Sequence, residues 1–157
     1  MRVAIAADHA GFSLKQPVCD ALRSWGHEVI DHGTHSANRV DFPDIVLPVC
    51  QSVREGISER GILLCGTGIG ACMAANKVTG IRAALCHDVH SAHQAVEHDD
   101  ANVMCLGAKI IGEWLAFDLI RAFLDARFAD EEHFRRRIAK MAEIEAGQRS
   151  TKPIETR

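Results

Sequence analysis

The chain has 157 residues and a mass of 17.2 kDa, which predicts one compact domain without room for a second core. Hydrophobic residues make up 47% and charged residues 25%, so the composition excludes a disordered or a fibrous protein. A net charge of −3 provides no general attraction to nucleic acid or to an anionic membrane. No stretch approaches 18 uninterrupted apolar residues, so no membrane span is expected.

Six cysteines and nine histidines stand out beside the absence of tyrosine. A chain of this length can bury an adequate core without disulfides, and it begins without a signal-type apolar stretch. We therefore expect a cytoplasmic protein with free thiols, which leaves the thiols and imidazoles available for chemistry.

Short apolar runs alternate with longer amphipathic ones along the chain. In chain order, they predict a strand at 3–7, a helix at 11–25, a strand at 28–31, a helix at 44–54, a strand at 61–65, a helix at 71–77, a strand at 81–86, a helix at 89–98, a strand at 102–106, and helices at 113–128 and 131–145. Pro17 and Pro48 fall inside two of these helices, where proline is unfavourable. Residues 1–146 are expected to form the domain and 147–157 a polar, loosely held tail.

Strands that alternate with helices predict a parallel sheet, because parallel strands need crossover connections and right-handed βαβ units supply them. We predict an α/β fold, a three-layer αβα sandwich around a Rossmann-like, doubly wound, five-stranded sheet. Ligands of such sheets bind beyond the carboxyl ends of the strands, near the switch in strand order.

Chemically active side chains follow several predicted strands. Asp8 and His9 follow the first strand, Cys65 ends the third, and Lys109 lies shortly after the fifth. Because parallel strands end at one edge of the sheet, these groups are expected to meet there. Asp and His also occur in loops for turn formation alone, which is the alternative for each of them singly.

A glycine-rich loop, Gly66-Thr67-Gly68-Ile69-Gly70, follows the third strand and opens a helix. Its backbone N–H groups can form a nest for an anion, with the helix dipole adding to the attraction. The loop lacks the Gly-Lys-Ser/Thr ending of a Walker loop and the spacing of a dinucleotide fingerprint. Close packing of the helix on the strand is the alternative explanation for its glycines.

Cys65 directly precedes this nest, and the helix N-terminus is expected to lower its pKa from about 8.5 toward neutrality. A thiolate here could act as a base or as a nucleophile. A cysteine phosphatase is excluded, because the position six residues later holds Ala71 instead of arginine. The remaining cysteines are expected to be small core side chains: Cys19, Cys50, Cys72, Cys86 and Cys105.

The histidines allow two interpretations. His90, His93 and Glu97 share one side of a predicted helix, but no CxxC or HExxH accompanies them, so a solvated face explains them better than a metal site. His98 ends that helix, and we expect it near the same carboxyl edge, where an imidazole could relay protons.

Three consecutive arginines, Arg135 to Arg137, form the one basic run of the sequence. Such a run is usually a solvated face, but it could also bind an anion such as phosphate. His133 and Arg137, four residues apart, would share one face of the last helix.

Several motifs in the same order resemble the type B ribose-5-phosphate isomerase family, which includes allose-6-phosphate and galactose-6-phosphate isomerases. The motifs are Asp8-His9-Ala10-Gly11-Phe12, Cys65-Gly66-Thr67-Gly68-Ile69-Gly70, Ala74-Ala75-Asn76-Lys77, Gly80-Ile81-Arg82-Ala83, and His98 with Asn102-Val103. The likeness runs from Arg2 to about Ala142.

The resemblance implies interconversion of an aldose phosphate and a ketose phosphate through an enediolate, without metal or cofactor. Cys65 would move the proton between C1 and C2, Thr67 would shuttle protons between the sugar oxygens, and the loop N–H groups would stabilise the enediolate. His98, aided by Asp8, would open the sugar ring. The residues expected to bind substrate are His9, Gly66, Gly68, Ile69, Gly70, Asp99, Lys109, His133 and Arg137.

The resemblance also implies a homodimer or a dimer of dimers with the site at the subunit interface. His98 and the C-terminal arginines would then act on a neighbour's Cys65.

The sequence departs from this family at the substrate-binding positions. Relatives that act on ribose 5-phosphate commonly have arginine at the positions of His133 and Lys109, and asparagine at that of Asp99. Tyrosine is frequent where Phe42 and His90 stand. A four-carbon or six-carbon sugar phosphate is therefore an alternative substrate. A non-catalytic phosphosugar- or nucleotide-binding module and a thiol hydrolase are alternatives of other classes.

Overall fold

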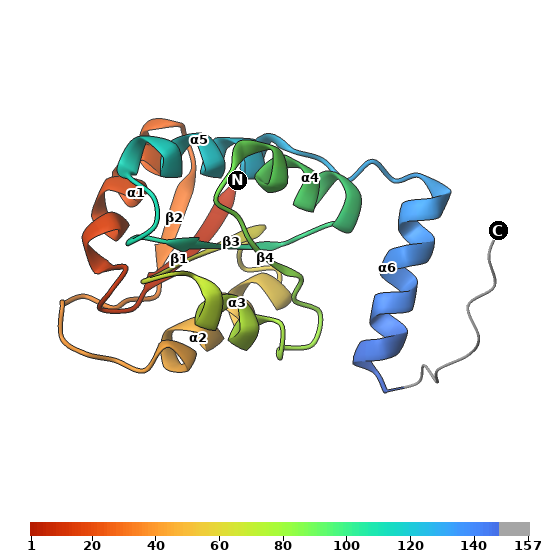
Figure 1. The fold of residues 1–157 in the computed structure, drawn as a ribbon, viewed down its shortest axis with the longest axis horizontal. Helices are drawn as coiled ribbons and strands as arrows, with labels where there is room; N and C mark the ends of the chain where they lie inside the picture. The colour runs from red at the N-terminus through yellow and green to blue at the C-terminus, as the bar shows by residue number, and fades with distance from the viewer. Residues whose placement is uncertain (148–157) are drawn as a thin grey trace.

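A five-stranded sheet with helices on both faces forms the centre of the fold (Figure 1). The structure is a computed structural model and describes residues 1–147. The strands are β1 (Arg2–Ala7), β2 (Glu28–Asp31), β3 (Arg60–Cys65), β4 (Ala83–Leu85) and β5 (Val103–Gly107). They lie in the order β2-β1-β3-β5-β4, and every pair is parallel. The predicted doubly wound α/β fold is confirmed.

The helices of the described part also follow the predicted order. They are α1 (Phe12–Ser24), α2 (Phe42–Arg54), α3 (Ile69–Ala75), α4 (Val89–Asp99), α5 (Glu113–Asp125) and α6 (Glu132–Glu145). Pro17 and Pro48 lie inside α1 and α2, and both helices continue through them because their apolar faces are buried. Within the predicted strand at 81–86, only Ala83–Leu85 pairs, with β5 at the edge of the sheet.

Alternating strand residues supply two separate cores. Val3 and Ile5 point to the face covered by α1, α4 and α5, whereas Ala4 and Ala6 point to the face covered by α2 and α3 (Figure 1). Both faces of the sheet are therefore buried. This explains why its strands are continuously apolar instead of alternating with polar residues.

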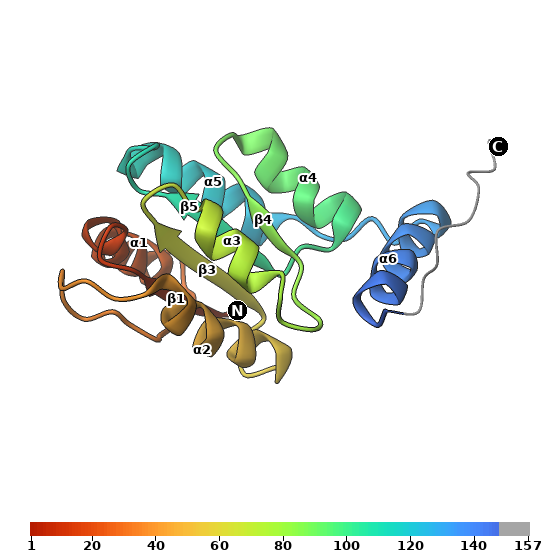
Figure 2. The same cartoon turned by 60° about the horizontal axis from the view of Figure 1, so that its bottom comes forward.

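Helix α6 stands apart from the sheet and packs beside α4 (Figure 2). Phe134 is its one buried residue. Near its other end, the Glu145 carboxylate accepts hydrogen bonds from the Gly80 N–H at 3.0 and 3.2 Å. Apart from Gly147, the predicted tail lies outside the described residues. Among residues 1–147, no helix has both the length and the apolar character needed to cross a bilayer.

Candidate active site

The switch in strand order lies between β1 and β3, and Asp8 and Cys65 stand at the carboxyl ends of these two strands. The Asp8 N–H donates to the Leu64 carbonyl at 3.0 Å. Its carboxylate is buried and accepts the N–H groups of Ala10 and Gly11 at 2.8 and 2.9 Å. Asp8 is thereby fixed at the point where a doubly wound sheet binds its ligand.

The Cys65 thiol hydrogen-bonds to the Asp8 carboxylate, and the N–H groups of Gly66 and Gly68 point toward its sulfur. Burial and then the neighbouring carboxylate raise the pKa of Cys65 above that of a free thiol, and the two N–H groups lower it by less. The expectation of a lowered pKa is therefore wrong for the single chain. The helix N-terminus can be read from the local sequence and predicts a lower pKa. The Asp8 carboxylate, which raises the pKa, is 57 positions away in the chain and cannot be placed beside Cys65 from the sequence.

The glycine loop adopts a shape that glycine makes possible. Gly68 has a φ of 78°, in the left-handed region, and precedes the first residue of α3. A side chain there would approach the Leu85 Cδ1 atom to 2.6 Å. Thr67 is exposed, and its hydroxyl accepts the Ile69 N–H at a long 3.4 Å. The loop thus turns its backbone N–H groups toward Cys65 and leaves the Thr67 side chain facing solvent.

Hydrogen bonds join this loop to the segment after β5. The Lys109 N–H donates to the Gly66 carbonyl at 3.0 Å, and the Ala108 N–H donates to that of Cys65 at 2.8 Å. Lys109 is exposed, as is His9 next to Asp8. The structure therefore brings together the predicted site residues of the carboxyl edge: Asp8, His9, Cys65, Gly66, Thr67, Gly68, Ile69, Gly70 and Lys109.

Phe42 also belongs to this edge, although it was not among the predicted site residues. A Cβ at Gly70 would lie 3.0 Å from the Phe42 ring, so the ring packs directly over the end of the glycine loop. The sequence feature that could have identified Phe42 is the tyrosine that is frequent at this position in the type B ribose-5-phosphate isomerase family.

His98 and Asp99 lie at the opposite edge of the sheet. Helix α4 runs antiparallel to the strands, so its last turn is next to the start of β5, whereas β3 points away from α6 (Figure 2). Cys65 pairs with Gly107, the last residue of β5, whereas the last turn of α4 lies near Val103, the first. The length of β5 between these two residues is about 13 Å. The expectation that His98 returns to the carboxyl edge is therefore wrong within one chain. A helix that follows a strand ends where the next strand begins.

Three predicted residues gather instead around one aromatic ring of α6. The His98 imidazole stacks on Phe134 with ring centroids 4.3 Å apart and an interplanar angle of 22°. The His133 ring lies 3.9 Å from the same phenyl ring, and the Arg137 guanidinium carbon lies 5.7 Å from it. We call these four residues the Phe134 cluster. It collects the groups expected to open the sugar ring and to bind phosphate.

The sequence matches the model of the Ribose/Galactose Isomerase family over residues 3–141. The chain belongs to this family. It is 44% identical over 129 residues to a D-erythrulose-4-phosphate isomerase of Pectobacterium atrosepticum, covering 82% of this chain and 85% of that protein. It is 40% identical over 135 residues to ribose-5-phosphate isomerase B of Escherichia coli, covering 86% and 91%.

A solved structure of ribose-5-phosphate isomerase B from Clostridium thermocellum has the same fold. Its TM-score is 0.91 at 44% identity, and the match covers 94% of this chain and 99% of that one. The protein is therefore a sugar phosphate aldose–ketose isomerase, as the sequence motifs predicted.

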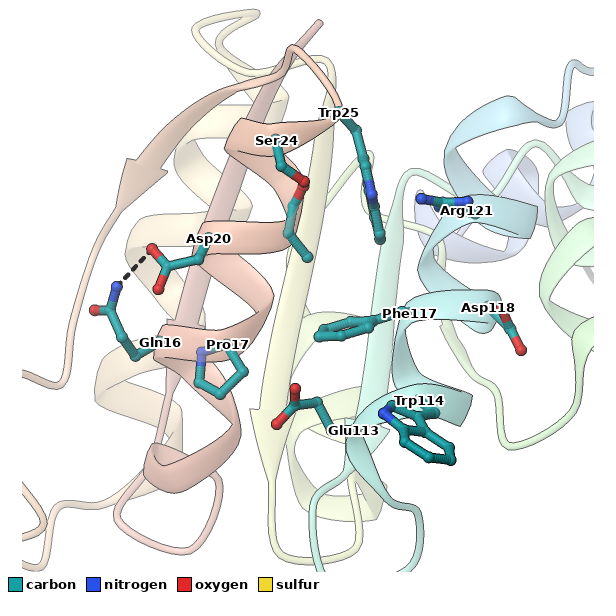
Figure 3. Close-up of a pocket in the computed structure, with 11 residues that line it drawn as sticks. Gln16, Pro17, Asp20, Ser24, Trp25, Glu113, Trp114, Phe117, Asp118 and Arg121 are labelled. Carbon is teal, nitrogen blue, oxygen red and sulfur yellow. Dashed lines mark hydrogen bonds between the residues drawn. The ribbon is translucent and has the colours of Figure 1, made fainter.

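A cavity of about 750 Å³ in this isomerase lies away from all the predicted site residues, between α1 and α5. Trp25 and Phe117 meet edge to face in it with ring centroids 6.0 Å apart, and the Arg121 guanidinium lies over the Trp25 ring (Figure 3).

The cysteines of the isomerase differ in their environments. Cys19, Cys50, Cys86 and Cys105 are buried, as predicted, whereas Cys72 is only half-buried, and all six thiols are free within the described residues. A hydrogen bond from the Cys105 thiol lowers the pKa of Cys72 to about 7, against the opposing effect of burial. Burial raises the pKa of Cys50 to about 11.

These pKa values predict the order of alkylation. Between pH 7 and 8, iodoacetamide is expected to modify Cys72 before Cys65, because only the thiolate reacts and Cys72 is the more ionised. Raising the pH should narrow the difference, since the Cys65 thiolate then becomes populated. Peptide mass spectrometry of a labelling time course measures both rates, with the buried Cys50 as an internal slow control. Faster labelling of Cys65 at pH 7 would contradict the assignment.

Proposed function

We propose that this isomerase interconverts ribose 5-phosphate and ribulose 5-phosphate through an enediolate. The observation that carries the proposal is the Cys65 thiol between the Asp8 carboxylate and the N–H groups of Gly66 and Gly68, at the switch point of the sheet. The five-carbon substrate is supported by the relatives from E. coli and C. thermocellum, whose names are ribose-5-phosphate isomerase B. A doubly charged substrate that does not cross a bilayer unaided supports a cytoplasmic location.

Cys65 acts as the base. Its thiol proton passes to the Asp8 carboxylate, and the thiolate then removes the proton from C2 of the open-chain aldose. The electrons of that C–H bond form the C1–C2 double bond, and the carbonyl oxygen at C1 takes the negative charge. Return of the proton to C1 gives the ketose. Cys65 thus serves as base and acid in turn.

The glycine loop stabilises the charge that develops on the sugar oxygens. Preorganised backbone N–H groups are the usual source of such stabilisation, and each is worth about 10²-fold or more in rate. Thr67, whose hydroxyl faces out of the loop, carries the proton between O1 and O2. No step needs a metal. In residues 1–147 no cluster of three or more His, Cys, Asp or Glu side chains could hold one.

A second copy of the chain completes the site. His98, Asp99, His133 and Arg137 lie at the amino edge, about one strand length from Cys65, so they do not reach the Cys65 of their own chain. We infer a homodimer, alone or paired into a dimer of dimers, in which each Phe134 cluster faces the partner's carboxyl edge. His98 opens the sugar ring there. His133 and Arg137 bind the phosphate together with His9 and Lys109 of the other chain.

A coupled assay of four-, five- and six-carbon sugar phosphates, run with a chelator, tests the proposed function. We expect ribose 5-phosphate to have the highest kcat/KM and the chelator to change nothing. Binding of all the sugars without turnover would overturn the isomerase and favour a binding module. Loss of activity with the chelator would overturn the metal-free mechanism.

A four-carbon sugar phosphate is the second candidate. It is favoured by the 44% identity to D-erythrulose-4-phosphate isomerase and by His133, where ribose-specific relatives commonly have arginine. His133 is held by the Glu131 carboxylate, 3.4 Å from its Nδ1 atom, and by the Phe134 ring. The highest kcat/KM on erythrulose 4-phosphate would replace the first proposal with this one.

Mixing two weakly active variants tests the shared site. Cys65→Ala and His98→Asn subunits are each expected to retain only a small, measurable residual activity on ribose 5-phosphate as homodimers. Co-refolded in equal amounts, they should recover about one quarter of the wild-type activity, because half of the dimers are mixed and each has one intact site. The measurement is activity after co-refolding, with separately refolded and then pooled variants as the control. No recovery despite dimer formation would show that both residues act within one chain.

A further inference from the structure

Phe134 differs from the rest of α6 in its burial. It is 6% exposed, and the remainder of the helix is half-buried or exposed. Helix α6 packs against α4, and Phe134 is the residue of α6 that this packing buries. The same phenyl ring contacts His98, which belongs to α4, and His133 and Arg137, which belong to α6. The Phe134 ring is therefore a contact that His98, His133 and Arg137 share.

We propose that Phe134 is a positioning residue that orients the His98 imidazole for opening of the sugar ring. The proposal deepens the proposed function and rests on it.

The geometry of the stack supports this role. An imidazole turns easily about its last side-chain torsion, which has broad minima. Stacking at 4.3 Å and 22° on a buried phenyl ring fixes the plane of the His98 ring. The Glu97 carboxylate, 3.6 Å from His98 Nε2, then sets the direction in which that nitrogen points within the plane. Phe134 therefore covers one face of the imidazole and leaves its nitrogen edge for the sugar.

The contact of His98 with Glu97 does not by itself fix the plane of the imidazole ring. Glu97 also lies 3.5 Å from His93 Nε2, so its carboxylate is shared between two imidazoles. His98 is half-buried and makes no hydrogen bond to the backbone of the described residues. Without the phenyl ring, only a shared and partly exposed ion pair would restrain the His98 side chain, and such pairs contribute little.

Sugar chemistry separates a positioning role from a purely structural one. Ribose 5-phosphate closes into a furanose through its O4 hydroxyl, so the enzyme must open a ring before it can isomerise the sugar. In a four-carbon aldose phosphate, O4 carries the phosphate, and no such ring can form. A residue that acts through His98 in ring opening should therefore matter more for ribose 5-phosphate than for erythrose 4-phosphate.

The test compares Phe134→Leu, which keeps an apolar side chain in the buried site, with Phe134→Tyr, which keeps the ring. We expect Phe134→Leu to lower kcat on ribose 5-phosphate about tenfold. The factor by which it lowers kcat on erythrose 4-phosphate should be at least three times smaller. KM should rise for both sugars, because Arg137 also rests on the ring. Phe134→Tyr should keep most of the wild-type kcat on ribose 5-phosphate, because it keeps the ring.

A double variant adds a readout that a structural role would not produce. In the His98→Asn background, Phe134→Leu should lower kcat on ribose 5-phosphate by less than about twofold further, because its effect passes through the missing imidazole. Phe117→Leu is the matched control, since it removes an aromatic ring in edge-to-face contact from the groove between α1 and α5 and should change the kcat on neither sugar (Figure 3). Thermal melts confirm that every variant is folded.

Equal losses on the two sugars, or losses that multiply in the double variant, would overturn the positioning role and leave the proposed function intact. A wild-type enzyme that turns over neither sugar, or only erythrose 4-phosphate, would overturn the proposed function and this inference together.

Discussion

Cys65→Ala is expected to lower kcat on ribose 5-phosphate by about 10³-fold or more, because a positioned general base contributes about 10²–10⁴-fold and no other described side chain lies in its place. Asp8 cannot substitute for it, since its carboxylate is fixed by the N–H groups of Ala10 and Gly11. The small loss of volume at the end of β3 should leave the fold intact. The measurements are steady-state kinetics and circular dichroism.

Cys65→Ser is the matched variant. A hydroxyl keeps the size and the hydrogen bond to Asp8 but ionises far less readily than a thiol, so it should be nearly as inactive as alanine. Cys72→Ala, one turn into α3, controls for removal of a thiol near the site and should retain most of the activity. A Cys65→Ala enzyme with wild-type activity would show that Cys65 is not the catalytic base of this protein.

Gly11→Ala is expected to have the largest effect on stability. A Cβ at Gly11 would fall on the backbone carbonyl of Leu64 and within 2.8 Å of the Cys65 nitrogen. The start of α1 would have to move away from β3, which would also break the N–H contact of Gly11 to the Asp8 carboxylate. We expect a loss of about 3 kcal/mol or more in the free energy of unfolding, or about 10 °C in Tm.

Gly112→Ala is the control for this substitution. Gly112 has an ordinary φ of −86° and no atom within 4 Å of the position of a Cβ. It precedes α5 as Gly11 precedes α1, so replacement there should cost no more than about 1 kcal/mol. Denaturant unfolding of both variants measures the difference. Equal stabilities would show that α1 can move from β3 without cost.

The carboxyl-edge half of the site could be predicted because its residues follow strands directly. Asp8, Cys65 and Lys109 each lie within two residues of a strand end, and the edge on which a strand ends is fixed once the sheet is parallel. The pKa of Cys65 could not be predicted in the same way. It depends on burial and on a carboxylate that only the pairing of β1 with β3 brings to the sulfur.

The amino-edge half shows the opposite case. The sequence pattern indicated that His133 and Arg137 share one face of the last helix. It also indicated that His98 ends the helix that became α4. It did not indicate that Phe134 joins them, because the packing of α6 on α4 is a contact between elements far apart in the chain. The stretch of backbone between α5 and α6 contains no periodic pattern that sets where α6 docks.

The sequence by itself determined the order of strands and helices, the doubly wound class and the membership of an isomerase family, since these follow from local periodicity and from motifs read in order. Only the tertiary structure decided which edge of the sheet each functional residue occupies. A motif fixes the identity and spacing of side chains, whereas the direction of a helix relative to the sheet fixes their place. That geometry separates Cys65 from His98 within one chain, which is the reason for our proposal that two chains build the site.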